Sequence, residues 1–473
     1  MKTIIKYFVF LSILLIAQTI YAQQNNTLFY MKNVPEASII NPAFQMDYKI
    51  FVGLPALSSI HANYGNNGFD YNRLINYGTG LQSDSLVFYP DKLLRDMRPT
   101  TYISLESHIN LLAAAYKYKN NYITFFATEK VELRIGIPRD LVKFIWKGNG
   151  AFLGKTANFS NLGIDAIHYR EYALGWSKPY NDKIMLGAKA KLLFGKSNIQ
   201  TKQSNISIYT DPNNYNMQVN SEMEINGSIP FIQLDYNYNP DVDSIELDVN
   251  DNKNFEVSRY LKNNKNWGFA LDLGGSYAYD SKTNIWVSLI DFGFIKWKTD
   301  LYNITQNGNF TWQGINGQPY LNEGDTSDHM EEFVDSLANI FKVTERNNQY
   351  YNYLTPKIYI GGTYKLNEKI DVGLLTKTEV YDNNLHSSLT ISSNANLWNW
   401  LGLCASYSII NNSFDNIGLG LAVRGGPIQF YIVNDNILGA LQPYATRNIN
   451  IRFGINLIFG YKEKEKASTL IGN

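Results

Sequence analysis

Histidines, cysteines and clustered acids most often carry catalysis or bind metals, and this chain of 473 residues has few of them in useful arrangements. Its single cysteine, Cys404, lies between Leu403 and Ala405, where we expect a small buried thiol. One cysteine forms neither an internal disulfide nor a cysteine-based zinc cluster. Neighbouring histidines are at least 47 residues apart, so no H-x-x-H or H-E-x-x-H metal-binding pair exists. The histidines are His61, His108, His168, His329 and His386.

Two further motifs match ligand-binding sites only in part. The Gly-Lys-Thr sequence at 154–156 is like the end of a phosphate-binding loop, but Asn149 stands where that loop needs its first glycine. Segment 241–256 carries six acids, yet Lys253 and Arg259 replace the glycine and the final glutamate of a calcium-binding loop. No Gly-x-Ser-x-Gly serine motif occurs. We therefore expect no catalytic residue, no cofactor and no metal ion, and a protein that is not an enzyme.

Composition excludes two other classes of protein. Lysine and arginine number 42 against 42 aspartates and glutamates, so the chain lacks the basic excess that nucleic-acid phosphates attract. Mean hydropathy is −0.25, and no internal stretch approaches the roughly 20 apolar residues of a membrane-spanning helix. Aromatic residues reach 14% of the chain, whereas charged residues fall to 18%, below the ~25% that is usual in soluble domains.

The first 22 residues are typical of a cleavable signal peptide. Lys2 and Lys6 precede an apolar run at 7–20, which is too short to span a membrane, and small Ala22 supplies the cleavage position. An uncleaved N-terminal membrane anchor is the alternative. No cysteine follows the run, which argues against a lipid-modified N-terminus. We expect an exported protein with a nearly neutral mature chain.

Alternation of apolar and polar residues with period two dominates the rest of the chain. In 448–461 seven apolar or aromatic residues share one parity, whereas the opposite parity holds asparagine, arginine and glycine. Segment 267–279 repeats this pattern, with aromatic and leucine side chains opposed by small or polar ones. Such alternation predicts half-buried β-strands rather than helices. The same pattern recurs at 171–177, 357–366, 370–380, 401–409 and 417–424.

Strand length and end chemistry favour a membrane barrel over a secreted β-sandwich, which is the alternative. Several segments run to 10–14 residues, and a tilted membrane strand needs roughly 9–11. Aromatic residues near the strand ends are typical of the two membrane interfaces. They are Tyr102, Tyr116, Trp267, Tyr277, Tyr279, Trp398, Trp400, Phe459 and Tyr461. We predict a transmembrane antiparallel β-barrel of about 14 strands, within a range of 12–16.

The predicted lumen is polar and crowded. Inward-facing glycines favour a curved sheet whose interior is occupied by a plug; they are Gly361, Gly373, Gly402, Gly418 and Gly420. Charged side chains should also point inward, because a lysine or arginine facing lipid at the midplane costs ~2–4 kcal/mol. The candidate lumen charges are Lys189, Lys191, Asp272, Asp371, Lys377, Glu379, Arg424 and Arg452. Their mixed signs argue against a strongly ion-selective pore.

Polar interruptions at 65–99, 138–167, 196–266 and 303–355 are expected as long extracellular loops, opposite short periplasmic turns. Two of them should contain short amphipathic helices. One begins near Asp328 and continues to Phe341, and the other runs from Pro138 at its first position to Trp146. We expect both to pack on the rim of the barrel. The helix at 328–341 has three alternatives: plugging the lumen, capping the pore or contacting a partner.

The N-terminal region carries a resemblance to known families. The sequence VPEASIINPA at 34–43, followed by FVGLP at 51–55 and LSS at 57–59, resembles an uncharacterised domain-of-unknown-function family of Bacteroidota outer-membrane proteins. Asn41, Pro42 and Ala43 are also similar to the N-terminal hatch of the long-chain fatty-acid transporter group, which includes the shuttle barrel of type IX secretion. This second resemblance implies a 14-stranded barrel whose N-terminal segment folds inward, with Asn41, Pro42 and Ala43 in the plug.

These expectations divide the chain into a signal peptide (1–22), a plug-like segment (23–46), a barrel (47–461) and a polar tail (462–473). The expected location is the outer membrane of a Gram-negative cell, with membrane lipid as the surrounding partner. Passive transport of hydrophobic or amphipathic small molecules through the plugged barrel is the favoured function. The alternative is a non-enzymatic scaffold or secretion-associated barrel, which would bind envelope proteins through its loops or periplasmic rim. No nucleic-acid partner is expected.

Overall fold

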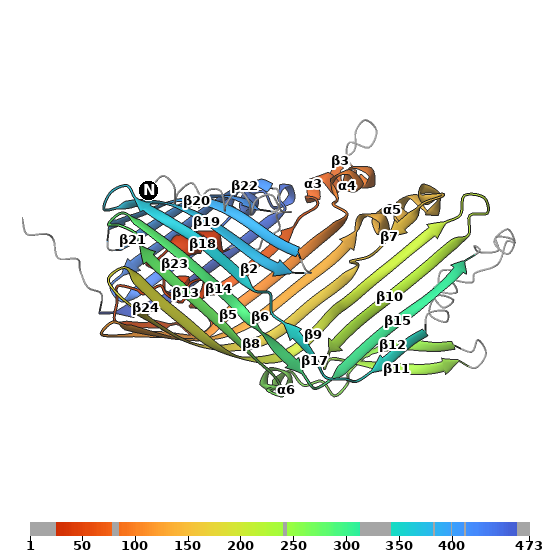
Figure 1. Ribbon diagram of the computed structural model, residues 1–473, viewed down its shortest axis with the longest axis horizontal. Helices are drawn as coiled ribbons and strands as arrows, with labels where there is room; N and C mark the ends of the chain where they lie inside the picture. The colour runs from red at the N-terminus through yellow and green to blue at the C-terminus, as the bar shows by residue number, and fades with distance from the viewer. Residues whose placement is uncertain are drawn as a thin grey trace, which may run out of the picture.

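Within the described residues of the computed structural model, antiparallel strands close into a barrel with fourteen strand positions around its wall (Figure 1). The structure describes residues 25–77, 85–239, 244–312, 342–381, 384–398, 400–410 and 413–460. The expected signal peptide, the polar tail at 462–473 and the helix expected at 328–341 lie outside them. Strands β1 (Ile50–Gly53) and β2 (Ile60–Asn66) share the first position and pair with the last strand, which closes the barrel. The predicted fold and strand number are confirmed.

The remaining barrel strands follow one another in chain order around the wall. They are β5 (Thr100–Tyr118), β6 (Asn121–Pro138), β8 (Gly163–Pro179), β9 (Ile184–Thr210), β13 (Asn266–Ala278), β14 (Thr283–Trp297), β18 (Lys357–Lys365), β19 (Ile370–Tyr381), β20 (Asn384–Trp398), β21 (Leu401–Ile410), β22 (Ser413–Gly425), β23 (Ile428–Asn434) and β24 (Asn448–Phe459). Strand β17 (Tyr350–Tyr353) also pairs with β14, beyond the end of β18. Among the described residues, closure gives each of the fourteen barrel positions a partner on both sides, as a wall surrounded by lipid requires.

The outer face of the barrel is apolar and the inner face is polar. On β13 and β21, large apolar side chains at alternate positions are exposed, among them Phe269, Leu273 and Leu403. On β24, Asn448, Asn450 and other polar residues of the opposite parity are buried. An apolar exterior around a polar interior is the arrangement that lipid demands of a barrel. Among the described helices, none has the length and apolar character of a transmembrane span.

Most of the aromatic residues expected at the membrane interfaces are exposed on the outer wall. They are Tyr116, Trp267, Tyr277, Trp398, Trp400 and Phe459, whereas Tyr461 lies outside the described residues. The expectation for Tyr102 is wrong. Its ring faces the interior and packs edge-on against Tyr381, with ring centroids 6.0 Å apart. Tyr102 shares the parity of the buried Glu106 and Asn110 of β5, so the pleat of that strand turns it inward.

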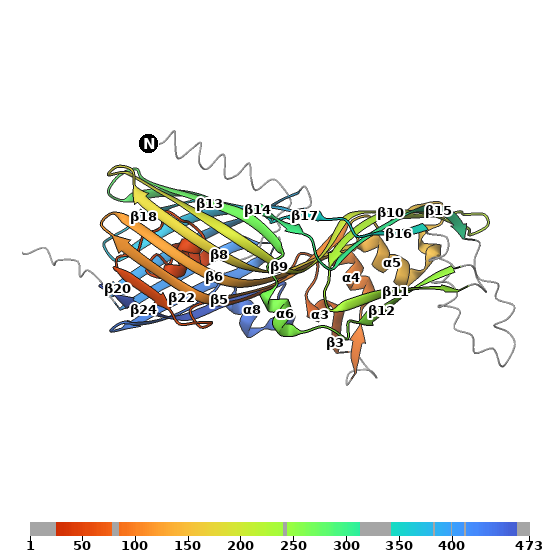
Figure 2. The ribbon, with the colours of Figure 1, turned by 90° about the horizontal axis from the view of Figure 1, so that it is seen from below.

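The barrel wall continues at one end into a projecting sheet (Figure 2). Strand β9 is 27 residues long, and its second half pairs with β10 (Met217–Ser228), which in turn pairs with β15 (Leu301–Trp312). The projecting sheet also contains β7 (Thr156–Asn158) and β16 (Lys342–Arg346). The segments expected as long loops at 196–266 and 303–355 contain strands in their described parts, whereas 313–341 lie outside the described residues. The exposed positions of β10 carry Gln218, Asn220 and Glu222. A strand with polar residues on its exposed face resembles a loop in its composition.

Short helices and hairpins lie at the same end of the barrel. Helix α5 (Arg139–Lys147) lies near the expected position, but Pro138 caps it instead of occupying its first turn. Leu141 and Phe144 pack against Phe152 and Phe159 of the adjoining loop. The other elements here are α3 (Tyr71–Leu74), α4 (Pro90–Asp96), η3 (Asn149–Phe152), α6 (Val257–Lys262), α8 (Ile437–Leu441), η5 (Pro443–Ala445) and the hairpins β3 (Ile75–Tyr77) with β4 (Leu86–Phe88) and β11 (Ile232–Asn239) with β12 (Ser244–Asp251).

Candidate functional site

Residues 25–46 fold into the lumen at the end of the barrel that carries the short turns (Figures 1 and 2). We call residues 25–46 the plug; it contains α2 (Asn26–Tyr30) and η1 (Pro35–Ile39). Phe29 is fully buried in an aromatic cluster with Phe44, Trp286 and Tyr359, and Lys32 Nζ lies 3.8 Å from the centre of the Trp286 ring. Apolar burial therefore holds the plug against the wall.

Glycines of the wall make the space that the plug fills. A Cβ atom added at Gly373 would overlap the ring of Tyr30, and one at Gly420 would overlap the sulfur of Met31. The three other inward glycines that the sequence indicated also face plug residues: Gly361 faces Phe29, Gly402 faces Asn33 and Gly418 faces Thr27. The small inner positions of these strands match the bulk of one N-terminal segment.

Polar contacts fix the plug at discrete points. Wall side chains donate hydrogen bonds to its backbone carbonyls: Lys189 Nζ to Ser38 at 2.8 Å, Ser288 Oγ to Ile40 at 2.7 Å and Gln429 Nε2 to Asn33 at 2.9 Å. The backbone N–H of Thr27 donates to Asp435 Oδ1 at 2.7 Å, and its hydroxyl lies 2.8 Å from Ser406 Oγ. The wall thus satisfies backbone groups that short helices leave open.

Asn41, Pro42 and Ala43 form a tight turn against two further glycines. The Asn41 side chain accepts a hydrogen bond from the Ala43 N–H at 2.9 Å and donates one to the Val287 carbonyl at 3.4 Å. A Cβ atom at Gly187 would overlap the Pro42 carbonyl, and one at Gly274 would overlap Asn41 and Pro42. The backbone of the turn therefore touches the backbone of strands β9 and β13.

Glu36 is a fully buried acid of the plug. Its Oε2 accepts a hydrogen bond from Asn456 Nδ2 at 3.0 Å. Burial raises the pKa of Glu36 from 4.5 to about 8, although this hydrogen bond and the nearby Arg452 guanidinium act in the opposite direction. Glu36 is therefore protonated at neutral pH while the plug is docked.

We expect docking of the plug to weaken as the pH rises through about 8. A released Glu36 in water has its ordinary pKa of 4.5, so between about pH 4.5 and about pH 8 only the docked state holds the proton. The free energy that favours docking is therefore largest below about pH 4.5 and decreases as the pH rises to about 8. Cys404 reports release, because its buried Sγ faces the Thr27 carbonyl at 3.8 Å. Maleimide labelling of Cys404 should rise several-fold more between about pH 6 and about pH 9 in the wild type than in Glu36→Gln.

The Glu36→Gln variant also corrects for the ordinary increase of thiol reactivity with pH. If both proteins show the same increase in labelling, Glu36 does not control docking.

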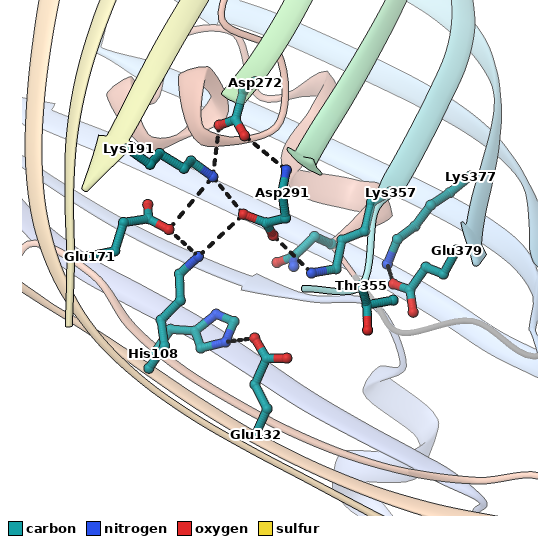
Figure 3. Close-up of polar contacts among 12 residues, drawn as sticks. His108, Glu132, Glu171, Lys191, Asp272, Asp291, Thr355, Lys357, Lys377 and Glu379 are labelled. Carbon is teal, nitrogen blue, oxygen red and sulfur yellow. Dashed lines mark hydrogen bonds and ion pairs between the residues drawn. The ribbon is translucent and has the colours of Figure 1, made fainter. Parts of the chain in front are cut away.

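Beyond the plug, six charged side chains from six neighbouring strands meet in the lumen (Figure 3). We call them the charged cluster: Lys130, Glu171, Lys191, Asp272, Asp291 and Lys357. Lys191 Nζ lies 2.8 Å from Asp272 Oδ2 and 2.6 Å from Asp291 Oδ1. Lys130 pairs with Glu171 at 2.8 Å, and Lys357 pairs with Asp291 at 3.0 Å. Three acids balance three lysines, which is how a buried cluster of charges is tolerated.

Asp291 enters the cluster through a β-bulge. Ile290 and Asp291 of β14 together oppose Asp272 of β13, so both face the interior although they are adjacent in sequence. Asp291 has a φ of 60°, in the left-handed region that aspartate tolerates better than most residues. Its backbone N–H donates to Asp272 Oδ1 at 2.8 Å. The bulge thereby directs one carboxylate toward three lysines.

The other charged residues indicated by the sequence lie on inward positions around the same lumen. Lys377 pairs with Glu379 at 2.7 Å, and Arg452 donates to Asn25 of the plug and to Ser59. Asp371 accepts from Asn394 at 2.7 Å. Arg424 lies near the short-turn end of β22, where its backbone N–H donates to the Trp400 carbonyl. Lys191 and Asp272 come together in the charged cluster, whereas Lys189 contacts the plug.

Four members of the cluster were not predicted as lumen residues: Lys130, Glu171, Asp291 and Lys357. Lys130 and Glu171 lie within long alternating strands, and a charge inside such a strand was a usable signal. Asp291 could not be placed by parity, because the bulge shifts the alternation at that residue. His61 and His108, 47 residues apart in sequence, lie with ring centroids 5.4 Å apart, and His108 Nε2 is 3.2 Å from Glu132.

Two cavities lie in series along the lumen. The inner cavity, about 50 Å³, touches the plug at Leu28 and Ile40 and is bordered by the charged cluster. The outer cavity, about 420 Å³, lies toward the projecting sheet. Asp291 and Lys357 line both cavities, so this ion pair stands between them. Among the described residues, no group of three or more His, Cys, Asp or Glu side chains is placed to hold a metal ion.

Several solved structures of bacterial transporters are similar to this chain at low identity. The Ralstonia pickettii toluene transporter TbuX has 11% identity and a TM-score of 0.38, with 90% of this chain and 94% of that chain covered. A Pseudomonas aeruginosa FadL homologue has 10% identity and a TM-score of 0.37, with 94% and 100% covered. The Pseudomonas putida toluene transporter TodX has 8% identity and a TM-score of 0.36, with 93% and 98% covered.

No curated protein matches the chain. A protein-family model does match it, over residues 42–435, which is most of its length. That model describes a family of unknown function, DUF5723, and this protein belongs to that family.

Proposed function

We propose that this protein is an outer-membrane channel for passive transport of small amphipathic molecules, closed at rest by its N-terminal plug. The proposal rests on the order of four features along one lumen: the outer cavity, the charged cluster, the inner cavity and the plug. A filled barrel needs no such compartments for stability alone. A route that opens in steps, by movement of the plug, would use them in turn.

The resting structure supports a closed state. An inner cavity of about 50 Å³ holds only a few water molecules, since each water needs roughly 10–15 Å³ by this measure. A solute therefore passes only if the plug moves. The plug is held by apolar packing and single hydrogen bonds, which can be exchanged for water or for a solute, and no disulfide cross-links it to the wall among the described residues.

The cavity walls favour amphipathic cargo over a purely hydrophobic one. Phe126, Ala173 and Ile290 supply apolar surface to the inner cavity, but charged groups of the cluster border the same space. Stripping water from a polar group without replacing its hydrogen bonds costs about 1–3 kcal/mol, and it costs more for a charged group. Cargo with its own hydrogen-bonding groups avoids this cost.

The orientation of the barrel supports uptake from outside the cell. Strands β5 and β6 are joined by two residues, and β22 and β23 by another two, all at the end that holds the plug. Long connections and the projecting sheet occupy the opposite end (Figure 2). Outer-membrane barrels keep short turns in the periplasm and long loops outside. The outer cavity would then face the environment, and the plug the periplasm.

A reversible cross-link between plug and wall tests the proposal. Thr27 and Ser406 have hydroxyl oxygens 2.8 Å apart, so cysteines at both positions should form a disulfide. In a Cys404→Ser background, the oxidised Thr27→Cys/Ser406→Cys protein is expected to admit benzenesulfonate into liposomes at least tenfold more slowly than the reduced protein. Benzenesulfonate is a suitable probe because it is small, amphipathic and permanently charged.

Each single cysteine variant is the matched control, and neither should respond to oxidation. Uptake that is equal in the oxidised and reduced double variant would contradict a plug-gated channel. That outcome would favour the second candidate, a scaffold that binds envelope proteins. The projecting sheet supports this candidate, because its strands β10 and β15 extend beyond the barrel as a separate surface.

A further inference from the structure

The outer cavity has the size of a small-molecule site. Its volume of about 420 Å³ falls within the 300–1,000 Å³ that is usual for ligand pockets. Strands β6, β8 and β9 form one side, and β17, β19 and the segment 354–356 form the other. Apolar contact surface comes from Ile167, Leu354 and Pro356.

Arg134 supplies a cation with unused hydrogen-bonding capacity. Its Nη1 donates to Thr355 Oγ1 at 2.7 Å, and its guanidinium lies over the Tyr381 ring, 4.4 Å from the centroid. Its Nη2 is 3.8 Å from Glu379 Oε2, which is too long for a hydrogen bond, and finds no hydrogen-bond partner among the described residues. A fixed guanidinium whose buried Nη2 lacks a hydrogen-bond partner is suited to bind a carboxylate.

Asp165 supplies an anion beside it. Asp165 of β8 is the cross-strand neighbour of Arg134 of β6, and its Oδ2 accepts a hydrogen bond from the Tyr381 hydroxyl. Tyr381 thus carries the cation over its ring and the anion at its hydroxyl. Glu132 lies on the same strand as Arg134, two residues away, and also lines the cavity.

The remaining polar lining is neutral or balanced. Gln200 and Asn352 present amides, each of which can both donate and accept hydrogen bonds, as a peptide group does. The Asn198 amide also lines the cavity, but it donates to the Ala166 carbonyl and accepts from the Tyr350 hydroxyl. The charged lining consists of three acids and three bases: Glu132, Asp165, Asp291, Arg134, Lys202 and Lys357. A balanced lining gives no preference to a net anion or a net cation, but it favours a ligand that carries both charges.

We propose that the outer cavity binds a zwitterionic, peptide-like small molecule, with its carboxylate at Arg134 and its ammonium group at Asp165. The amides of the wall bond the backbone of the ligand, and the apolar surface around Leu354 and Pro356 receives a side chain. This deepens the proposed function by naming the substrate class, and its role in transport rests on that function. Binding itself does not depend on transport.

Binding of the dipeptide alanyl-phenylalanine to the full chain in detergent tests the site, measured by calorimetry. The free dipeptide is expected to bind at least tenfold more tightly than its N-acetyl derivative or its C-terminal amide, since each cap removes one charge. Toluene should not compete. These ligand comparisons use the wild-type protein, so they need no variant to fold.

Two variants assign the ends of the ligand. Arg134→Gln should abolish the preference for the free dipeptide over its amide, and Asp165→Asn the preference over the N-acetyl form. Asp182→Asn, in an exposed turn at the opposite end, is the matched control and should keep both preferences. Retained heat-modifiable gel mobility shows that each variant is folded.

Equal binding of free and capped dipeptides would overturn the proposal, as would competition by toluene. Failure of this binding proposal can be distinguished from failure of the transport proposal, because the cross-linking experiment measures uptake. Charge-dependent binding together with uptake that ignores the cross-link would keep the site and remove the channel. Cross-link-sensitive uptake without charge-dependent binding would keep the channel and remove this assignment of its cargo.

Discussion

Replacing Gly274 by alanine is expected to release the plug and raise the labelling rate of Cys404 by about tenfold or more. The added Cβ overlaps Asn41 and Pro42, and the contact includes backbone of the plug that cannot rotate away. Overpacking of this kind costs roughly 1–3 kcal/mol, and 1.4 kcal/mol shifts an equilibrium tenfold. Adding Gly187→Ala, whose Cβ overlaps the Pro42 carbonyl, should increase the effect. Maleimide labelling and liposome permeability measure it.

Gly275 provides the matched control on the same strand. A Cβ atom there would lie at least 3.8 Å from every neighbouring atom that it meets, so Gly275→Ala adds the same methyl group without strain. Labelling of Cys404 should stay at the wild-type rate in this control. If Gly274→Ala also labels at that rate, contact with the wall does not hold the plug at 41–43.

Replacing Asp291 by asparagine is expected to destabilise the barrel by about 3–5 kcal/mol, the usual loss when one partner of a buried ion pair is removed. Asp291 lies within 4 Å of Lys130, Lys191 and Lys357, and the change leaves three lysines facing two acids. Asparagine also tolerates the left-handed backbone at this position, so the comparison isolates the charge. Urea unfolding in detergent, followed by gel mobility, gives the free energy of unfolding.

Glu224→Gln is the control for this second result. Glu224 pairs with Lys202 at 2.8 Å, but the Lys202 side chain is 59% exposed, and such surface pairs contribute about 0–1 kcal/mol. The double variant Asp291→Asn/Lys357→Met should recover part of the loss, because it restores the balance of charge. If Asp291→Asn is as stable as the wild type, the cluster does not depend on charge balance.

Alternation, strand length and aromatic strand ends predicted the barrel, and the inward glycines predicted its filled lumen. Each glycine among Gly361, Gly373, Gly402, Gly418 and Gly420 faces a plug residue, because a strand that must admit a buried segment cannot carry bulk there. The inward position of Lys191 and Asp272 followed from the same parity. These features are local consequences of a period of two, and one sequence displays them directly.

The bulge, the projecting sheet and the outer cavity could not be predicted from a period of two. The bulge at Asp291 exchanges the two faces of β14, so parity would have placed this carboxylate on the lipid side. The projecting sheet was mistaken for loops, because its strands lie in water and carry polar residues outward. The outer cavity joins residues of β6, β8, β17 and β19, whose proximity exists only once the barrel has closed.

The pairing of β1 with β24 closes the barrel, and we call it the closure seam. It links two steps in the assembly of this protein. Strand β24 pairs with β1, joining Ile50 to Phe459 across almost the whole chain, and such distant contacts form slowly. Residues 47–49 connect the plug to this seam, and the Lys49 N–H donates to the Phe459 carbonyl. Pairing of β1 with β24 therefore also brings residues 25–46 to the mouth of the lumen. A chain that closes with its N-terminus outside holds the plug beside an empty barrel, and it completes folding by the same docking movement that closes the proposed channel.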